Sequence, residues 1–138
     1  MTRPVIPVAN IDTKPFWDGC GEGRLLLQRC AGCGAWRHPP SPICPNCLDP
    51  KHEWIAATGR GTVYTFVVVR EARRGWDKMV PYVLAVIALE EGPHILTDLT
   101  DVAPEDVAIG MKVEVTFEEL DGTTKLPLFR PRQEGRPQ

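Results

Sequence analysis

Two pairs of cysteines are the residues of this chain best suited to chemistry. Cys30 and Cys33 are separated by two residues, and Cys44 and Cys47 repeat that spacing ten residues later. A two-residue gap lets one tight turn present two sulfur atoms to one ion, and two such turns supply the four tetrahedral thiolates that zinc prefers. The spacing therefore predicts a metal centre at these four cysteines. Zinc is the expected metal, with iron as the rival for a four-cysteine site.

A shell of four cysteines is closed, so the predicted zinc is structural and does not act as a Lewis acid. The fifth cysteine, Cys20, stands alone ten residues before Cys30 and is interpreted as a plain thiol. The three histidines have no carboxylate or cysteine at a catalytic spacing, and neither a Gly-x-Ser-x-Gly elbow nor a phosphate loop occurs. We therefore predict no catalytic residue, and we expect no autonomous activity.

The segments on either side of the cysteines predict the elements that hold them. Residues 24–30 favour a short strand leading into the first turn, and residues 52–55 favour a strand that returns from the second. Two turns on two hairpins form a zinc ribbon. Upstream, residues 13–17 predict a short helix with Thr13 as N-cap and a proline in its first turn, stopped by the glycines that follow.

The part of the chain after Gly61 is a series of strand patterns. Residues 62–69 are rich in β-branched and aromatic side chains, and residues 82–89 are apolar on both alternating faces. Residues 104–110 favour a turn or a single helical turn. The remaining predicted strands are 93–99, 112–118 and 126–129, the last as an edge strand because it contains Pro127. Five short strands predict a small barrel of the OB-fold type.

Composition and charge narrow the function classes. Hydrophobic residues make up 43% and charged residues 25% of the 138 residues, as in ordinary globular proteins. The net charge of −2 disfavours nucleic-acid binding, which usually needs a basic stripe. No apolar run approaches the ~20 residues of a transmembrane helix, and the first ten residues lack a secretory pattern. We expect a cytoplasmic protein that binds neither membrane nor nucleic acid.

A set of motifs spread from Phe16 to Pro131 gives the chain a family resemblance. In order, they are Phe16-Trp17-Asp18-Gly19, Leu26-Leu27-Gln28-Arg29-Cys30 with Cys33-Gly34, His38-Pro39-Pro40, Cys44-Pro45-Asn46-Cys47, Gly59-Arg60-Gly61-Thr62-Val63-Tyr64-Thr65-Phe66, Val80-Pro81-Tyr82, Ile109-Gly110-Met111-Lys112-Val113-Glu114-Val115 and Leu126-Pro127-Leu128-Phe129-Arg130-Pro131. With them the sequence resembles the OB-fold proteins with a rubredoxin-like zinc ribbon that are associated with acyl-CoA metabolism. Leu48 departs from the glycine often found at its position.

The resemblance implies a mainly β protein with a fixed order of parts. These are a partly helical N-terminal arm over residues 1–24, a rubredoxin-like zinc ribbon over 25–57, a five-stranded OB-fold barrel over 58–131 and a flexible tail over 132–138. It also implies a non-catalytic accessory subunit of an acyl-CoA thiolase or aldolase complex. The partner, a thiolase-superfamily enzyme or an acyl-CoA hydratase, would carry out the chemistry on a coenzyme A thioester, in a hetero-oligomer with two copies of each chain.

In that role the small chain stabilises its partner and helps to bind or channel the acyl-CoA. Two other functions stay open: a nucleic-acid-binding module, because zinc ribbons and OB-folds also serve that purpose, and a free acyl-CoA carrier. Phosphates and an adenine favour cations beside an aromatic ring, so the predicted substrate-binding residues are Arg73, Arg74, Trp76 and Lys78. The alternative is a solvated hairpin tip.

Three large apolar residues lie in parts of the chain with little core of their own. Phe16, Trp17 and Trp36 are the predicted contacts with a partner protein, since exposed aromatic clusters mark interaction sites. The alternative is that all three fold back onto the barrel.

Overall fold

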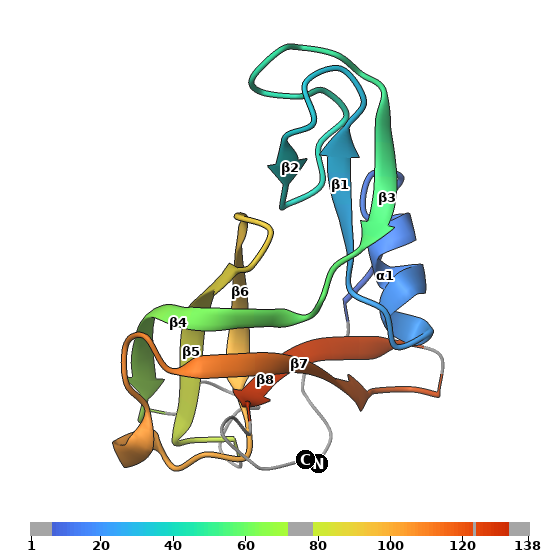
Figure 1. Cartoon of the computed structure of the whole chain (residues 1–138). Coiled ribbons are helices and arrows are strands. Elements are labelled where there is room, and N and C mark those ends of the chain that lie inside the picture. Colours follow the sequence, from blue (N-terminus) through green and yellow to red (C-terminus); the bar gives the residue numbers. More distant parts are fainter. Residues whose placement is uncertain (1–6, 72–78, 123, 133–138) are drawn as a thin grey trace, which may run out of the picture.

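A short helix, a three-stranded sheet and a small barrel follow one another along the chain (Figure 1). The structure is a computed structural model that describes residues 7–71, 79–122 and 124–132. In Figure 1 the three-stranded sheet stands as a projection on the barrel, and the helix lies beside the base of that projection. Within the described ranges, no helix combines the length and the apolar character that a membrane crossing needs.

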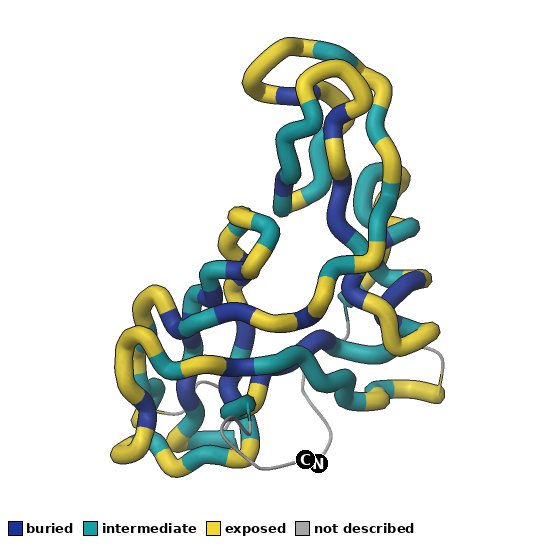
Figure 2. Tube along the Cα trace, viewed as in Figure 1, coloured by how far each residue is buried: buried dark blue, intermediate teal, exposed yellow. Residues whose placement is uncertain are grey.

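A three-stranded sheet carries both cysteine turns; two of its strands were predicted from the sequence, and the short β2 was not. Strand β1 (Leu26–Cys30) lies between β2 (Trp36–Arg37) and β3 (His52–Ala56), and both neighbours are antiparallel to it. Because β1 ends at Cys30, the sheet places the first cysteine turn at its tip. Figure 2 shows mostly exposed chain at this tip and more buried residues toward the base.

Helix α1 (Lys14–Gly21) forms where predicted, but its start is stabilised differently. Thr13 occupies the N-cap position without a side-chain capping hydrogen bond. Instead, Asn10 Oδ1 accepts hydrogen bonds from the backbone N–H groups of Asp12 and Thr13, both at 2.9 Å. Thr13 Oγ1 in turn accepts one from the Asn10 N–H at 2.9 Å. The helix entry is therefore fixed by an Asn-centred turn that precedes it.

The second half of the described chain is the predicted five-stranded barrel, closed in the order β4-β5-β6-β8-β7. Strand β4 pairs with both β5 and β7, and a bulge between Val63 and Thr65 helps it to bend around the barrel. The predicted helical turn is the 3-10 helix η1 (Pro104–Asp106). The strands are β4 (Arg60–Val69), β5 (Tyr82–Leu89), β6 (His94–Leu99), β7 (Lys112–Glu119) and β8 (Lys125–Pro131).

Pro127 belongs to β8, which has a neighbouring strand on each side in the closed barrel, so the prediction that β8 is an edge strand is wrong. Strand β8 pairs with β7 along its whole length, but it pairs in parallel with β6 only at Leu99 and Phe129. Beside the proline, the Thr97 hydroxyl donates a hydrogen bond to the Pro127 carbonyl at 3.1 Å. The proline is tolerated because the ladder on its β6 side is interrupted there.

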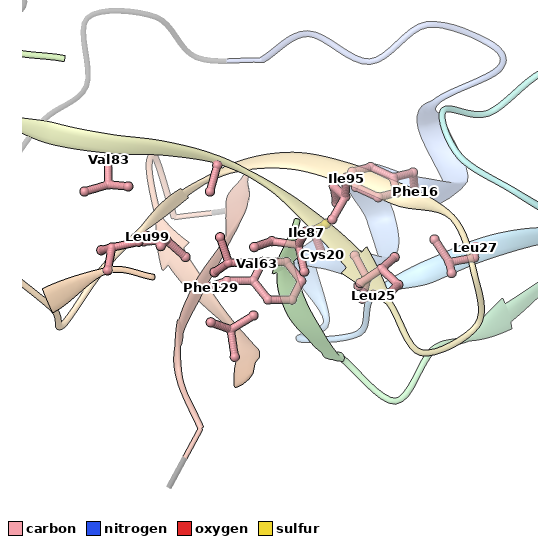
Figure 3. Close-up of a cluster of buried hydrophobic side chains, with 14 residues drawn as sticks. Phe16, Cys20, Leu25, Leu27, Val63, Val83, Ile87, Ile95, Leu99 and Phe129 are labelled. Carbon is pink, nitrogen blue, oxygen red and sulfur yellow. The ribbon is translucent and has the colours of Figure 1, made fainter. Parts of the chain in front are cut away.

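One hydrophobic core joins the helix, the sheet and the barrel (Figure 3). Phe16 and Cys20 from α1 and Leu27 from β1 belong to the same buried cluster as the barrel residues Ile87 and Phe129. Phe16 is only 5% exposed, so it lies in the chain's own core and not on a free surface. A helix too short to be stable alone is held here by tertiary packing.

The link between sheet and barrel is fixed by hydrogen bonds from both sides. The Thr58 N–H donates to Glu91 Oε2 and the Thr58 hydroxyl donates to Glu90 Oε1, both at 2.9 Å. The Gly59 carbonyl accepts a hydrogen bond from the Val115 N–H at 2.7 Å. Gly59 is buried with φ of +81°, and a Cβ added there would lie 2.5 Å from Val115 Cγ1. The link therefore has space only for glycine.

Gly59→Ala should lower the free energy of unfolding by about 2–4 kcal/mol, because it combines a left-handed backbone with overpacking against Val115. Gly23→Ala is the matched control: Gly23 has a similar φ of +77°, but no atom lies within 4 Å of the added Cβ. It should cost only about 1 kcal/mol. Urea denaturation measures both, and equal losses would show that the fit at Val115 is not a constraint.

Candidate functional site

The first cysteine turn is built around the Cys30 sulfur. The Gly34 N–H donates to the Cys30 carbonyl at 3.0 Å and closes the turn. The N–H groups of Gly32 and Cys33 point at Cys30 Sγ from 3.3 and 3.4 Å. Gly34 adopts φ of +76°, so the glycine supplies the left-handed residue that ends this turn. N–H groups directed at sulfur favour the thiolate, which is the form that binds metal.

The second cysteine turn repeats this geometry with a residue poorly suited to it. The Leu48 N–H donates to the Cys44 carbonyl at 2.8 Å, as Gly34 does to Cys30. Leu48 has φ of +66°, a conformation that costs a residue with a Cβ about 1–2 kcal/mol. Its side chain is 72% exposed, so little packing offsets that cost. The departure from glycine noted in the sequence therefore keeps the turn but strains its backbone.

The four sulfur atoms of Cys30, Cys33, Cys44 and Cys47 converge on one point. All lie within 4.8 Å of one another, with 3.5 Å between the sulfurs of Cys30 and Cys47 and 3.7 Å between those of Cys33 and Cys44. Four sulfurs around zinc at a bond length of about 2.3 Å lie about 3.8 Å apart in a tetrahedron. The spacing of the sulfurs thus fits a tetrahedral metal ion.

The pKa values of the cysteines show how these sulfurs compete for charge. The backbone N–H of Cys47, helped by that of Asn46, lowers the pKa of Cys44 to about 6. The pKa of Cys47 is raised to about 12: the Asp49 N–H acts against this, but the neighbouring Cys30 sulfur disfavours a second negative charge. Not all four thiols can ionise together unless a cation joins them, and a divalent metal supplies that cation.

Cys20 belongs to the shared hydrophobic core and not to the cluster of four sulfurs. It is completely buried in the shared core, and burial raises the pKa of its thiol to about 12. A protonated, inaccessible thiol is inert. Its surroundings agree with the interpretation of Cys20 as a plain thiol.

Gln28 forms a buried polar link across the sheet that the sequence analysis did not single out. Its Oε1 accepts hydrogen bonds from Arg37 Nε and from the Ser41 N–H, each at 2.8 Å. Its Nε2 lies 3.2 Å from His52 Nε2. The side chain thus connects all three strands with the segment that leads to Cys44. No sequence signal indicated this role, because Gln28 lies in a short strand beside the exposed Arg29 and its partners come from distant segments.

An apolar groove of about 440 Å³ lies where helix, sheet and barrel meet. Trp17 of α1 and Leu96 of β6 contribute to its walls, and Leu96 is 65% exposed. His38 also lines it, with its ring 5.2 Å from that of Phe16, and burial lowers the pKa of this histidine. Such a lining suits contact with an apolar group. The other lining residues are Pro7, Thr13, Phe16, Pro39, Pro40, Leu84, Ile95, Thr97, Asp98, Leu126, Pro127 and Leu128.

The predicted partner contacts fall in different surroundings. Phe16 is buried, with its ring edge-to-face against Trp17 at 5.1 Å between centroids. Trp17 is half-buried in the wall of the groove. Trp36 is half-buried on β2, with the Arg29 guanidinium 5.2 Å from its ring centroid. The structure therefore brings Phe16 and Trp17 together and keeps Trp36 with Arg29. The predicted substrate-binding residues Arg73, Arg74, Trp76 and Lys78 lie outside the described residues.

Two family profiles match consecutive parts of the chain, which together cover residues 17–118. The rubredoxin-like zinc ribbon domain of ChsH2 matches residues 17–53, and the C-terminal OB-fold domain of ChsH2 matches residues 54–118. The "Ltp2-ChsH2(DUF35) aldolase" is a solved structure with a TM-score of 0.84 and 36% identity, covering 91% of this chain and 98% of the matched one.

Two relatives illustrate the range of proteins that contain this unit. A "DUF35 domain-containing scaffold protein" of Methanocaldococcus jannaschii is 44% identical over 97 residues, which are 70% of this chain and 69% of that protein. A "probable enoyl-CoA hydratase alpha subunit" of Thermomonospora curvata is 38% identical over 125 residues, which are 91% of this chain. The present chain spans only 39% of the length of that hydratase subunit.

Serine at Cys30, Cys33, Cys44 or Cys47 should abolish stoichiometric zinc and unfold the tip of the sheet, since structural zinc supplies about 10 kcal/mol or more of folding free energy in small sites. Elemental analysis should find about one zinc per wild-type chain. Cys20→Ala is the control and should retain it. Loss of zinc from Cys20→Ala with retention in Cys47→Ser would contradict the ligand set.

Leu48→Gly should raise the free energy of unfolding of the zinc-loaded protein by about 1 kcal/mol, because it relieves the left-handed backbone at an exposed residue. Gly34→Ala at the equivalent place in the first turn should change it by a similar amount in the opposite direction. Chemical denaturation at saturating zinc measures both variants. A destabilised Leu48→Gly protein would show that the leucine side chain contributes packing to the turn.

Proposed function

This chain belongs to the DUF35 family, whose members combine a rubredoxin-like zinc ribbon with an OB-fold, and on that premise we propose that it is a non-catalytic accessory subunit of an acyl-CoA enzyme complex. In this proposal the partner is an aldolase, thiolase or hydratase acting on a coenzyme A thioester. The small chain stabilises that partner and helps to bind or channel the substrate.

The observation that carries this proposal is the near-complete match to the ChsH2 chain of a two-component aldolase. That match covers helix, ribbon and barrel together, at an identity well above the level at which only the fold is informative. Two curated relatives named as hydratase alpha subunits support the same class of role, because they contain this unit as part of a longer subunit. The scaffold name given to three archaeal relatives agrees with a role in assembly.

We further propose that zinc, held by Cys30, Cys33, Cys44 and Cys47, serves structure alone. Four sulfur donors fill a tetrahedral shell, so no position would remain for water or substrate. The bound ion would stabilise the folded tip of the ribbon, where the described residues are mostly exposed. The cysteine turns present their sulfurs to the ion and shield them with N–H groups.

The apolar groove is the surface we propose for contact with the partner enzyme. It is the meeting point of the three structural parts. Exposed Leu96 offers apolar surface there, and tryptophans such as half-buried Trp17 are among the residues that dominate interface energy. An apolar groove does not favour single-stranded nucleic acid, which needs a basic groove with stacking aromatics. The basic segment with Arg73 and Arg74 stays the proposed contact for coenzyme A phosphates on sequence grounds alone.

Leu96→Glu should abolish co-elution with the aldolase-, thiolase- or hydratase-type enzyme that co-purifies with the tagged wild-type chain, because a buried, unpaired carboxylate disfavours the interface. Ile109→Glu is the matched control: Ile109 is 70% exposed, lies just before β7 and is not among the groove's lining residues. It should co-elute normally. Circular dichroism should show both variants folded.

Two results would contradict the proposal. Wild-type chain that co-purifies with RNA or DNA and with no acyl-CoA enzyme would favour the nucleic-acid module. Acyl-CoA turnover by the isolated chain, lost on mutation of one of its own residues, would show that the subunit is itself catalytic.

A further inference from the structure

Arg37 on β2 is a buried cation, with only 7% of the residue exposed. Among the residues that the structure describes, no carboxylate forms a hydrogen bond or ion pair with it. Nε donates to Gln28 Oε1 at 2.8 Å, and one terminal nitrogen, Nη2, donates to the Ser41 carbonyl at 3.0 Å. The other terminal nitrogen, Nη1, is buried and has no hydrogen-bond partner among the described residues. In that part of the chain Arg37 also forms no ion pair.

This arrangement requires an explanation, because both partners of the guanidinium are neutral. Burying a charge is unfavourable unless an opposite charge compensates it. Arginine cannot lose its proton at any ordinary pH, so it cannot escape the cost by becoming neutral. A negative charge on another group near the sheet would offset this cost.

The placement of Arg37 points to the cysteine cluster as that group. In the register of the sheet Arg37 pairs with Gln28, two residues before Cys30 on β1. Side chains two residues apart on a strand share a face, so Gln28 and Cys30 lie on one face with their Cα atoms roughly 7 Å apart. Ser41, the second contact of Arg37, precedes Cys44 by three residues. The guanidinium thus spans the two segments that supply Cys30 and Cys44.

We propose that Arg37, positioned by Gln28 and Ser41, is the internal counter-ion of the zinc–thiolate centre. This inference rests on the proposed zinc site, where four thiolates and one divalent ion leave a net double negative charge. Arg37 offsets that charge across the interior of the ribbon, and Gln28 holds the guanidinium without neutralising it. A glutamate in place of Gln28 would satisfy Arg37 directly and remove its effect on the metal.

The same contact links the metal centre to the apolar groove. Arg37 and Ser41 bracket His38, Pro39 and Pro40, which form one wall of the groove. The hydrogen bond from Arg37 Nη2 to the Ser41 carbonyl closes this short loop. The guanidinium proposed as the counter-ion therefore also holds this wall of the groove in place.

The test is the rate at which zinc leaves the purified full-length protein for an excess of chelator, followed with a metal-sensitive dye. Arg37→Met should bind zinc but release it about tenfold faster, the effect typical of groups that support metal ligands. Arg37→Lys keeps the charge and should release zinc within about threefold of wild type. Arg24→Met is the matched control, because Arg24 is exposed and pairs with Glu22; its rate should match wild type.

Gln28→Glu separates a counter-ion from a merely structural residue. It keeps the shape of the side chain and the acceptor for Arg37 Nε, so a structural role predicts unchanged or slower release. The counter-ion role predicts release about tenfold faster, because the new carboxylate neutralises Arg37.

If the wild-type protein contains zinc, either of two results would overturn the proposal. One is an equal rate of zinc release from Arg37→Lys and Arg37→Met, and the other is unchanged or slower release from Gln28→Glu. Wild-type protein without zinc would instead refute the metal site itself.

Discussion

The core that α1, β1 and the barrel share is the interaction on which the rest of the molecule depends. Phe16 and Cys20 of the helix and Leu27 of β1 are buried against barrel residues such as Ile87, so none of the three parts has a separate interior (Figure 3). A helix of eight residues would not persist alone. The fixed link at Thr58 and Gly59 then determines how the sheet projects from the barrel.

Stabilisation changes character along the projecting sheet. Its base is held by apolar packing, whereas its tip is mostly exposed and has two cysteine turns in place of a core. Between them lies the polar layer of Gln28 and Arg37. A metal held by the four cysteines would supply at the tip the stabilisation that burial supplies at the base. This division fits the proposal that zinc serves the structure of this chain and takes no part in catalysis.

Sequence patterns predicted the local features well. Cysteine spacing predicted the turns. β-Branched and aromatic content, an apolar run and one alternating pattern together predicted the five barrel strands, because all of these signals are local. The groove was not predictable, since Trp17, Pro39, Leu96 and Leu128 come from four distant segments. The burial of Phe16 was also undecidable from sequence, because an aromatic residue on a short helix fits a core and an interface equally well. Pro127 was misjudged because the interruption of the β6 ladder depends on barrel closure.

In the proposed function, the groove where helix, sheet and barrel meet receives the partner enzyme. The decisive measurement is hydrogen–deuterium exchange of this chain, alone and with the acyl-CoA enzyme that co-purifies with it. We expect slower exchange on binding in residues 13–17, 95–98 and 126–128 together, because these separate segments line one groove. Protection confined to η1 and β7, with those three segments unchanged, would contradict it.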